Sequence, residues 1–439
     1  MPFTPLPPGY TGNQPDTGPR QPAAPDRLRF TSVNATIAAT PLRTILLWIA
    51  ASLLGVGLLI ALAFPLLWAG LGTVTFFSVM AFFSLATVTA IMMLANFWHP
   101  QPIVLTILAI LWGAVPTAGI AILLETVLDL IVFTLTNSPE LAHQFSMALS
   151  APVIEEVLKG LGLLALLLAA RKNFNGPLDG LVFGALIGGG FAFIENIQYY
   201  ISGYEEYGAI GGGVLILMRG VGSIFLHPLF TSLTGLIMGA ATRAWGTVAG
   251  ALIFFGAVWP AIVLHFGWNL AALTSDGAIV LISFLVLFTL SALWLALIGL
   301  LLYDQARLMR ARLTDYVHEG WLLPQEVHML GSSKGRREAK RWAATFGATT
   351  LMQRFIKDAA ELALARQRIL ADGPSPARLT EERHLLSQAI ADRQELLSRA
   401  SSMTIQQPVQ LPPLLLSGPP TTGITPRGPS QHLGQWRGR

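Results

Sequence analysis

Long runs of apolar residues constrain this chain more than any other feature of its sequence. Several runs of about eighteen or more residues are nearly free of charge, and each can cross a hydrocarbon layer of about 30 Å at about 1.5 Å per residue. Only 12% of the 439 residues are charged and 53% are hydrophobic, more apolar surface than a soluble core can bury. The sequence therefore predicts an all-α, polytopic membrane protein.

Proline, glycine and polar residues divide the apolar runs into about eight transmembrane helices. The predicted spans are 44–64, 72–95, 103–124, 147–170, 178–200, 214–241, 249–272 and 279–303. The segment 125–146 either extends the third span or forms a short outer helix.

The orientation of the bundle is predicted from the basic residues of its loops, which favour the cytoplasmic side. If both termini are cytoplasmic, all the basic loop residues lie on that side, namely Arg171, Lys172, Arg243, Arg307, Arg310 and Arg312. The opposite loops then carry only acidic residues, which are Asp129, Glu140, Glu205, Glu206 and Asp276.

Composition divides the chain into four predicted parts. They are a disordered Pro-rich tail (1–41), a transmembrane domain (42–303), a cytoplasmic helical appendage (304–400) and a second disordered Pro-rich tail (401–439). The appendage is predicted to contain amphipathic helices at 304–330, 335–371 and 380–400. Residues 304–439 hold 19 Lys or Arg against 12 Asp or Glu, so we expect this region to lie near anionic lipid; no nucleic-acid motif is present.

Two further features limit the chemistry and the packing of the bundle. The chain has no cysteine, which excludes disulfides, thiolate metal ligands and thiolate nucleophiles. Glycine recurs at every fourth residue in two neighbouring spans, which predicts close helix packing at Gly180, Gly184 and Gly188 and at Gly235 and Gly239.

Charged residues inside the predicted spans need a specific reason. The fourth span carries Glu155, Glu156 and Lys159, and each charge at the centre of a bilayer costs about 2.5–3.5 kcal/mol on insertion scales. Lys159 lies three and four residues after the glutamates, so it shares a helix face with them and can neutralise one carboxylate. The motif is either a structural ion pair or part of a functional site.

The next three spans add polar residues of the same kind. They are Glu195 and Asn196 in the fifth span, Arg219, His227 and Thr231 in the sixth, and His265 and Asn269 in the seventh. In the predicted topology most of the charged and histidine side chains fall within ~12 Å of the outer surface, with His227 nearer the middle. A shared depth predicts one cavity in the outer half of the bundle.

Carboxylates, imidazoles and amides suit hydrolysis without a covalent intermediate. A glutamate in a low-dielectric cavity can act as general base towards water, while histidine or asparagine donors stabilise the developing oxyanion. Alternatively, Glu156, His227 and His265 would hold Zn²⁺ with an open position. The sequence leaves both alternatives open, and it contains neither HExxH nor a serine elbow.

Four motifs follow one another within 150–272, namely EExxK, FxxxEN, a histidine with threonine four residues later, and HxxWN. In this order they resemble the PrsW family of bacterial intramembrane proteases, which is similar to the CAAX prenyl protease group. The resemblance implies that Glu155, Glu156, Lys159, Glu195, Asn196, His227, His265 and Asn269 are catalytic and that Arg219 and Thr231 support them. It implies cleavage of a membrane-anchored protein, such as an anti-sigma regulator. The predicted depth in the outer half of the bundle fits a cut near the extracytoplasmic face of the plasma membrane.

Two other classes of protein are compatible with the polar cluster. A proton- or ion-coupled transporter would line its path with such residues, but the inverted repeats typical of transporters are not visible in the sequence. A catalytically inactive membrane scaffold would use the cluster only for packing.

Overall fold

The computed structural model describes the backbone of residues 41–274 and 276–404, and all its regular elements are helices. The predicted all-α class is therefore confirmed for this part of the chain. The predicted disordered tails lie outside the described residues, except for Pro41 and for 401–404, which end the last helix. The contacts within the chain divide it into two units, Met1–Ser52 and Leu53–Arg439. Every contact described below lies within Leu53–Arg439, and of the first unit only the helical backbone of 41–52 is described.

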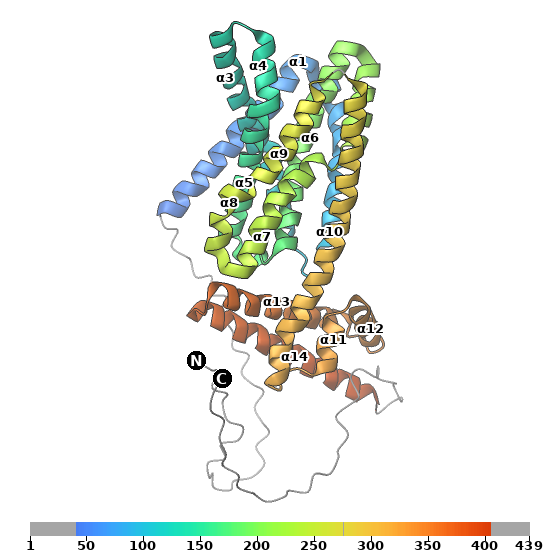
Figure 1. Cartoon of the computed structure of the whole chain (residues 1–439). Helices are drawn as coiled ribbons and strands as arrows, with labels where there is room; N and C mark the ends of the chain where they lie inside the picture. The colour runs from blue at the N-terminus through green and yellow to red at the C-terminus, as the bar shows by residue number, and fades with distance from the viewer. Residues whose placement is uncertain (1–40, 275, 405–439) are drawn as a thin grey trace, which may run out of the picture. The chain divides into compact units, whose positions relative to one another are not determined.

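Fourteen α-helices follow one another in the described part of the chain (Figure 1). They are α1 (Pro41–Ala95), α2 (Ile103–Trp112), α3 (Ala118–Thr136), α4 (Pro139–Phe145), α5 (Ala151–Ala169), α6 (Pro177–Leu215), α7 (Leu226–Leu252), α8 (Phe254–Ala257), α9 (Trp259–Ala272), α10 (Gly277–His318), α11 (Pro324–Leu330), α12 (Ser333–Ala344), α13 (Thr349–Asp372) and α14 (Pro376–Thr404). Three wider, π-helical turns join neighbouring helices, at η1 (Gly113–Thr117), η2 (Ser146–Ser150) and η4 (Ile216–Gly222).

Five helical stretches among the described residues are long and apolar enough to cross a membrane, which makes the chain a multi-pass membrane protein. They are Ala69–Ala95, Ile103–Thr136, Pro177–Leu252, Phe254–Ala272 and Gly277–His318. The count of eight stays a prediction. The 76 residues of Pro177–Leu252 contain two of the predicted spans. Helix α5 is long enough to cross a membrane, but its three charged residues keep it out of the five apolar stretches. The side chains of the predicted span 44–64 lie almost entirely outside the described residues.

The segment after the third predicted span is helical at a position where the sequence analysis expects an acidic loop residue. Helix α3 continues to Thr136 and ends where Asn137 takes a left-handed conformation (φ 52°), before the short helix α4. The segment 125–146 therefore both extends the third span and forms a short separate helix. The prediction that Asp129 lies in a loop is wrong, because its sequence neighbours continue the apolar helix of α3.

Glycines bring α6 and α7 together along the most extensive helix contact of the described bundle. A Cβ atom placed on Gly180 would lie 1.9 Å from the carbonyl oxygen of Gly235, and one on Gly184 would lie 2.6 Å from that of Thr231. Only a hydrogen in place of a side chain allows backbones to approach so closely. The predicted close packing is confirmed, and it sets the distance between the two helices that carry Glu195 and His227.

The C-terminal helices α11 to α14 pack on the last turns of α10, which continues without a break from the apolar bundle (Figure 1). The predicted single helix 335–371 is wrong: it is divided into α12 and α13 at 345–348, where Gly347 takes a positive φ of 68°. Likewise 304–330 is divided, because α10 ends at His318 and Gly320 takes a φ of 80°.

Contacts attach this C-terminal domain to the segment 171–176 and to the kink of α7 at Gly246 (φ 89°), two places where the sequence predicts loops. Asp372 of α13 pairs with Arg171 at 3.0 Å and accepts a hydrogen bond from the backbone N–H of Thr247 at 2.6 Å. Arg368 donates to Asn175 Oδ1 at 2.8 Å. The sequence predicts that both segments lie on the same side of the membrane as the C-terminus. Their common contact with the C-terminal domain supports that expectation. Which side this is stays a prediction.

Candidate active site

The three charged residues of α5 are buried inside the bundle. Glu156 and Lys159 are 0% exposed and Glu155 is 5% exposed. Because an α-helix repeats every 3.6 residues, Lys159 lies on the same face as both glutamates. Its Nζ atom lies 3.0 Å from Glu155 Oε2 and 2.8 Å from Glu156 Oε1. The same Nζ lies 3.2 Å from Nδ1 of His227 on α7. The ammonium group therefore joins α5 to α7 and balances part of the acidic charge.

Glu156 is held from three sides and has little freedom to move. Besides Lys159, Nδ1 of His265 on α9 lies 3.1 Å from its Oε1, and Thr231 of α7 donates to its Oε2 at 3.0 Å. His265 Nε2 also lies 3.9 Å from Glu155 Oε2. Hydrogen bonds to a buried carboxylate fix its orientation as well as compensating its burial.

A second carboxylate group lies on the other side of His227. Glu195 Oε2 lies 2.5 Å from His227 Nε2 and 2.6 Å from Arg219 Nη2. The guanidinium group also donates from Nε to Asn196 Oδ1 at 3.1 Å. Because Glu195 and Lys159 contact the two different ring nitrogens of His227, the imidazole ring is fixed in plane and direction.

Arg219 and His227 meet Glu195 at one level although they are eight residues apart. In a straight helix they would be separated by about 12 Å along the axis. The prediction of one continuous helix over 214–241 is wrong: η4 ends at Gly222, a turn follows, and α7 begins at Leu226. Pro228 falls in the first turn of α7, where its missing N–H costs little. This break brings Arg219 back beside His227.

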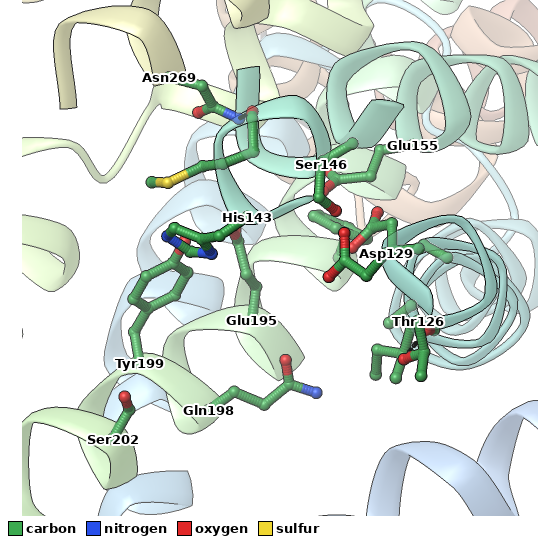
Figure 2. A pocket seen from close by; sticks show the side chains of 17 residues that line it. Thr126, Asp129, His143, Ser146, Glu155, Glu195, Gln198, Tyr199, Ser202 and Asn269 are labelled. Atoms are coloured by element: carbon green, nitrogen blue, oxygen red, sulfur yellow. Dashed lines mark hydrogen bonds between the residues drawn. The ribbon is translucent and has the colours of Figure 1, made fainter. Parts of the chain in front are cut away.

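Asn269 lies apart from the carboxylates. It donates from Nδ2 to the carbonyl oxygen of Met147 at 2.9 Å and forms part of the wall of a cavity of about 470 Å³. The same cavity is lined by Glu155 and Glu195 (Figure 2), whereas Glu156 is not part of its lining. A second cavity of about 250 Å³ shares Met147, Tyr199 and Asn269 with the first. Open space therefore lies beside the buried cluster.

Sequence reasoning missed the acidic wall that α3 contributes to this cavity. Glu125 and Asp129 line it, and Figure 2 shows Asp129 at its wall; Glu125 Oε1 and Asp129 Oδ1 are buried without a hydrogen-bond partner among the described residues. Their spacing of four residues in an otherwise apolar helix was the available signal. Tyr199 also lines the cavity, and the Arg219 guanidinium lies 3.9 Å from the centre of its ring.

The donor atoms of the cluster fit a metal ion. Glu155, Glu156, His227 and His265 each offer one oxygen or nitrogen, and these atoms all lie within 4.8 Å of one another. Two imidazoles with carboxylate oxygens are a donor set that suits Zn²⁺. The ammonium of Lys159 contacts three of these four residues, so a metal ion bound here would have to displace it.

Comparison with known protein families bears on this arrangement. Residues 101–296 match the model of the PrsW family intramembrane metalloprotease, which covers α5, α6, α7 and α9 and confirms the resemblance predicted from the motifs. No curated protein and no solved structure matches the chain.

Proposed function

We propose, from the chain's membership of the PrsW family of intramembrane metalloproteases over residues 101–296, that it hydrolyses a peptide bond in a membrane-tethered protein. One observation carries the proposal. Three helices, α5, α7 and α9, bring the donor atoms of Glu155, Glu156, His227 and His265 within 4.8 Å, and Glu155 borders a cavity of about 470 Å³. Such a cluster beside open space inside an apolar bundle gives water and a peptide a common place to react.

The two glutamates of α5 have different roles in this proposal. Glu155 borders the cavity and its carboxylate contacts the ammonium group of Lys159, so it takes a proton from the attacking water. Water oxygen adds to the scissile carbonyl carbon, the C–N bond breaks, and the proton passes from Glu155 to the leaving nitrogen. Glu156, held by Lys159, Thr231 and His265, orients these groups rather than exchanging the proton.

Two donors would stabilise the negative charge that develops on the carbonyl oxygen. The amide of Asn269 borders the cavity, and Nε2 of His265 lies near Glu155. Arg219 and Glu195 position His227 and do not meet the reacting atoms in this scheme. A Zn²⁺ ion held by Glu156, His227 and His265 would supply Lewis acidity at the scissile carbonyl.

The substrate class is proposed from the position of the site. A peptide that occupies both cavities would pass Met147, Tyr199 and Asn269, with chain on each side of the cut. In the predicted topology the cut falls near the extracytoplasmic face of the plasma membrane. A membrane-anchored regulator, such as an anti-sigma factor, is the substrate that the sequence resemblance implies.

The test is cleavage of a co-expressed single-pass membrane protein by the full chain. Glu155→Gln, Glu156→Gln and His227→Ala are each expected to lower the rate by at least about 100-fold, since general acid–base catalysis contributes about 10²–10⁴-fold. The matched control is Glu205→Gln, an exposed glutamate on the same helix as Glu195. Membrane insertion and unfolding temperature are measured for each variant. Full cleavage by all three site variants would remove the protease proposal and leave an inactive scaffold.

A further inference from the structure

A third cavity, with an unusual charge balance, lies at the other end of the bundle from the candidate active site. It measures about 210 Å³ and is enclosed by the turn 97–100 and by helices α12 and α13. The turn connects two of the candidate membrane spans, Ala69–Ala95 and Ile103–Thr136. The cavity therefore lies within a few residues of the ends of two membrane helices, where the lipid headgroups are expected.

Arg336 is the innermost cation of this cavity. It is only 4% exposed, its Nε donates to the carbonyl oxygen of Leu330 at 2.7 Å, and its guanidinium lies 4.4 Å from the centre of the Trp98 ring. No carboxylate pairs with it among the described residues. Burial alone lowers the pKa of Arg336 to about 10. A buried cation without an anion is costly, so an anion that enters the cavity would be stabilised beside Arg336.

The rim of the cavity adds more positive charge than negative. Lys340 follows Arg336 by one helical turn and has no carboxylate partner among the described residues, and Lys357 comes from α13. Glu361 is the acidic residue in the described lining, and it already lies 3.6 Å from Lys357. His99 Nδ1 is also buried, and no hydrogen-bond partner for it lies in the described part of the chain. Three cations and an imidazole thus face one carboxylate.

The aromatic residues of the turn place the cavity at the membrane surface. Phe97 is 43% exposed and follows the end of the Ala69–Ala95 span, while Trp98 is buried beneath Arg336. Tryptophan and tyrosine are the aromatic residues typical of the headgroup level, and Trp98 lies within a few residues of the ends of two candidate spans. The volume is below that of pockets for drug-sized ligands, which are about 300–1,000 Å³, and suits a compact anionic group.

We propose that the cavity formed by Trp98, Arg336, Lys340 and Lys357 binds a phosphate group, supplied by the headgroup of an anionic phospholipid. The headgroup would connect the C-terminal domain to the bilayer beside the loop 96–102. This site is separate from the glutamate and histidine cluster and does not depend on the proposed protease activity.

Native mass spectrometry of the full chain, released from an uncharged detergent, tests the proposal. The protein is titrated with phosphatidylglycerol, with phosphatidylcholine, and with phosphatidylglycerol in the presence of inorganic phosphate. We compare Lys340→Gln and Lys357→Gln with Lys334→Gln, a control on α12 outside the cavity. The Lys357 side chain is 70% exposed, so its replacement should not disturb folding, and unfolding temperatures verify this.

The wild type and Lys334→Gln are expected to hold one saturable phosphatidylglycerol in preference to phosphatidylcholine. Lys340→Gln and Lys357→Gln should each weaken that binding about fivefold, and the double variant about 25-fold, from the usual contribution of a lysine near an anionic surface. Equal binding by the cavity variants and the control, or equal binding of the two lipids, would overturn the proposal. Displacement of the lipid by equimolar inorganic phosphate would overturn the lipid source and assign the site to free phosphate.

Discussion

Replacing Gly188 by alanine should separate the two helices that hold Glu195 and His227. A Cβ atom on Gly188 would lie 2.3 Å from the carbonyl oxygen of His227, whereas ordinary van der Waals contact begins near 3.4 Å. The helices must therefore part locally by about 1.1 Å, the difference between these distances. The obstructing atoms belong to the backbone, so no side-chain rotation can relieve the clash.

Gly188→Ala is expected to impair catalysis as well as folding. His227 Nε2 and Glu195 Oε2 are 2.5 Å apart, and a shift of about 1 Å would remove that contact. Misplacing a catalytic group by about 1 Å costs about 100-fold in rate. Forcing an extra methyl group into a packed interior costs about 1–3 kcal/mol of unfolding free energy.

The matched control is Gly213→Ala in the last turn of α6, in the helical segment that follows the kink at Gly208 (φ 66°). An added Cβ there meets nothing within 4 Å, so activity should be unchanged, and the helix should gain about 0.5–1 kcal/mol. The assays are the initial rate of cleavage of the co-expressed substrate and the unfolding temperature of the purified protein in detergent. Gly188→Ala with the cleavage rate of Gly213→Ala would refute the reasoning, whatever its unfolding temperature.

Three further predictions concern other parts of the chain. Asp372→Asn should lower the unfolding free energy by about 1–3 kcal/mol, seen as a lower unfolding temperature, because it leaves the largely buried Arg171 without its carboxylate; an unchanged temperature would show that this contact is dispensable. Glu125→Gln should change the rate of cleavage but keep the unfolding free energy within about 0.5 kcal/mol, since its buried Oε1 has no partner; wild-type kinetics would exclude the acidic wall from substrate binding. A chelator should abolish cleavage, and Zn²⁺ should restore it, if Glu156 and its neighbours hold a metal; full activity in metal-free protein, verified by elemental analysis, would assign catalysis to the glutamates alone.

Much of the candidate site could be predicted because intramembrane charge is costly wherever it occurs. Glu155, Glu156 and Lys159 stand out in an apolar run without knowledge of any contact. The glycine spacing similarly predicted a close seam between two helices, since a four-residue period places small residues on one face. Glu125 and Asp129 were harder to interpret, because a segment of uncertain helical extent made them resemble loop residues.

The sequence by itself determined the all-helical class, the membrane environment and the order of the motifs, because these follow from local composition and from the periodicity of a helix. It did not determine that Arg219 and His227 reach the same carboxylate, since that depends on the break between η4 and α7. Nor did it determine that Lys159 contacts His227, 68 residues away. Long apolar runs reveal that a chain enters a membrane; only the packing of helices against one another decides which buried charges meet inside it.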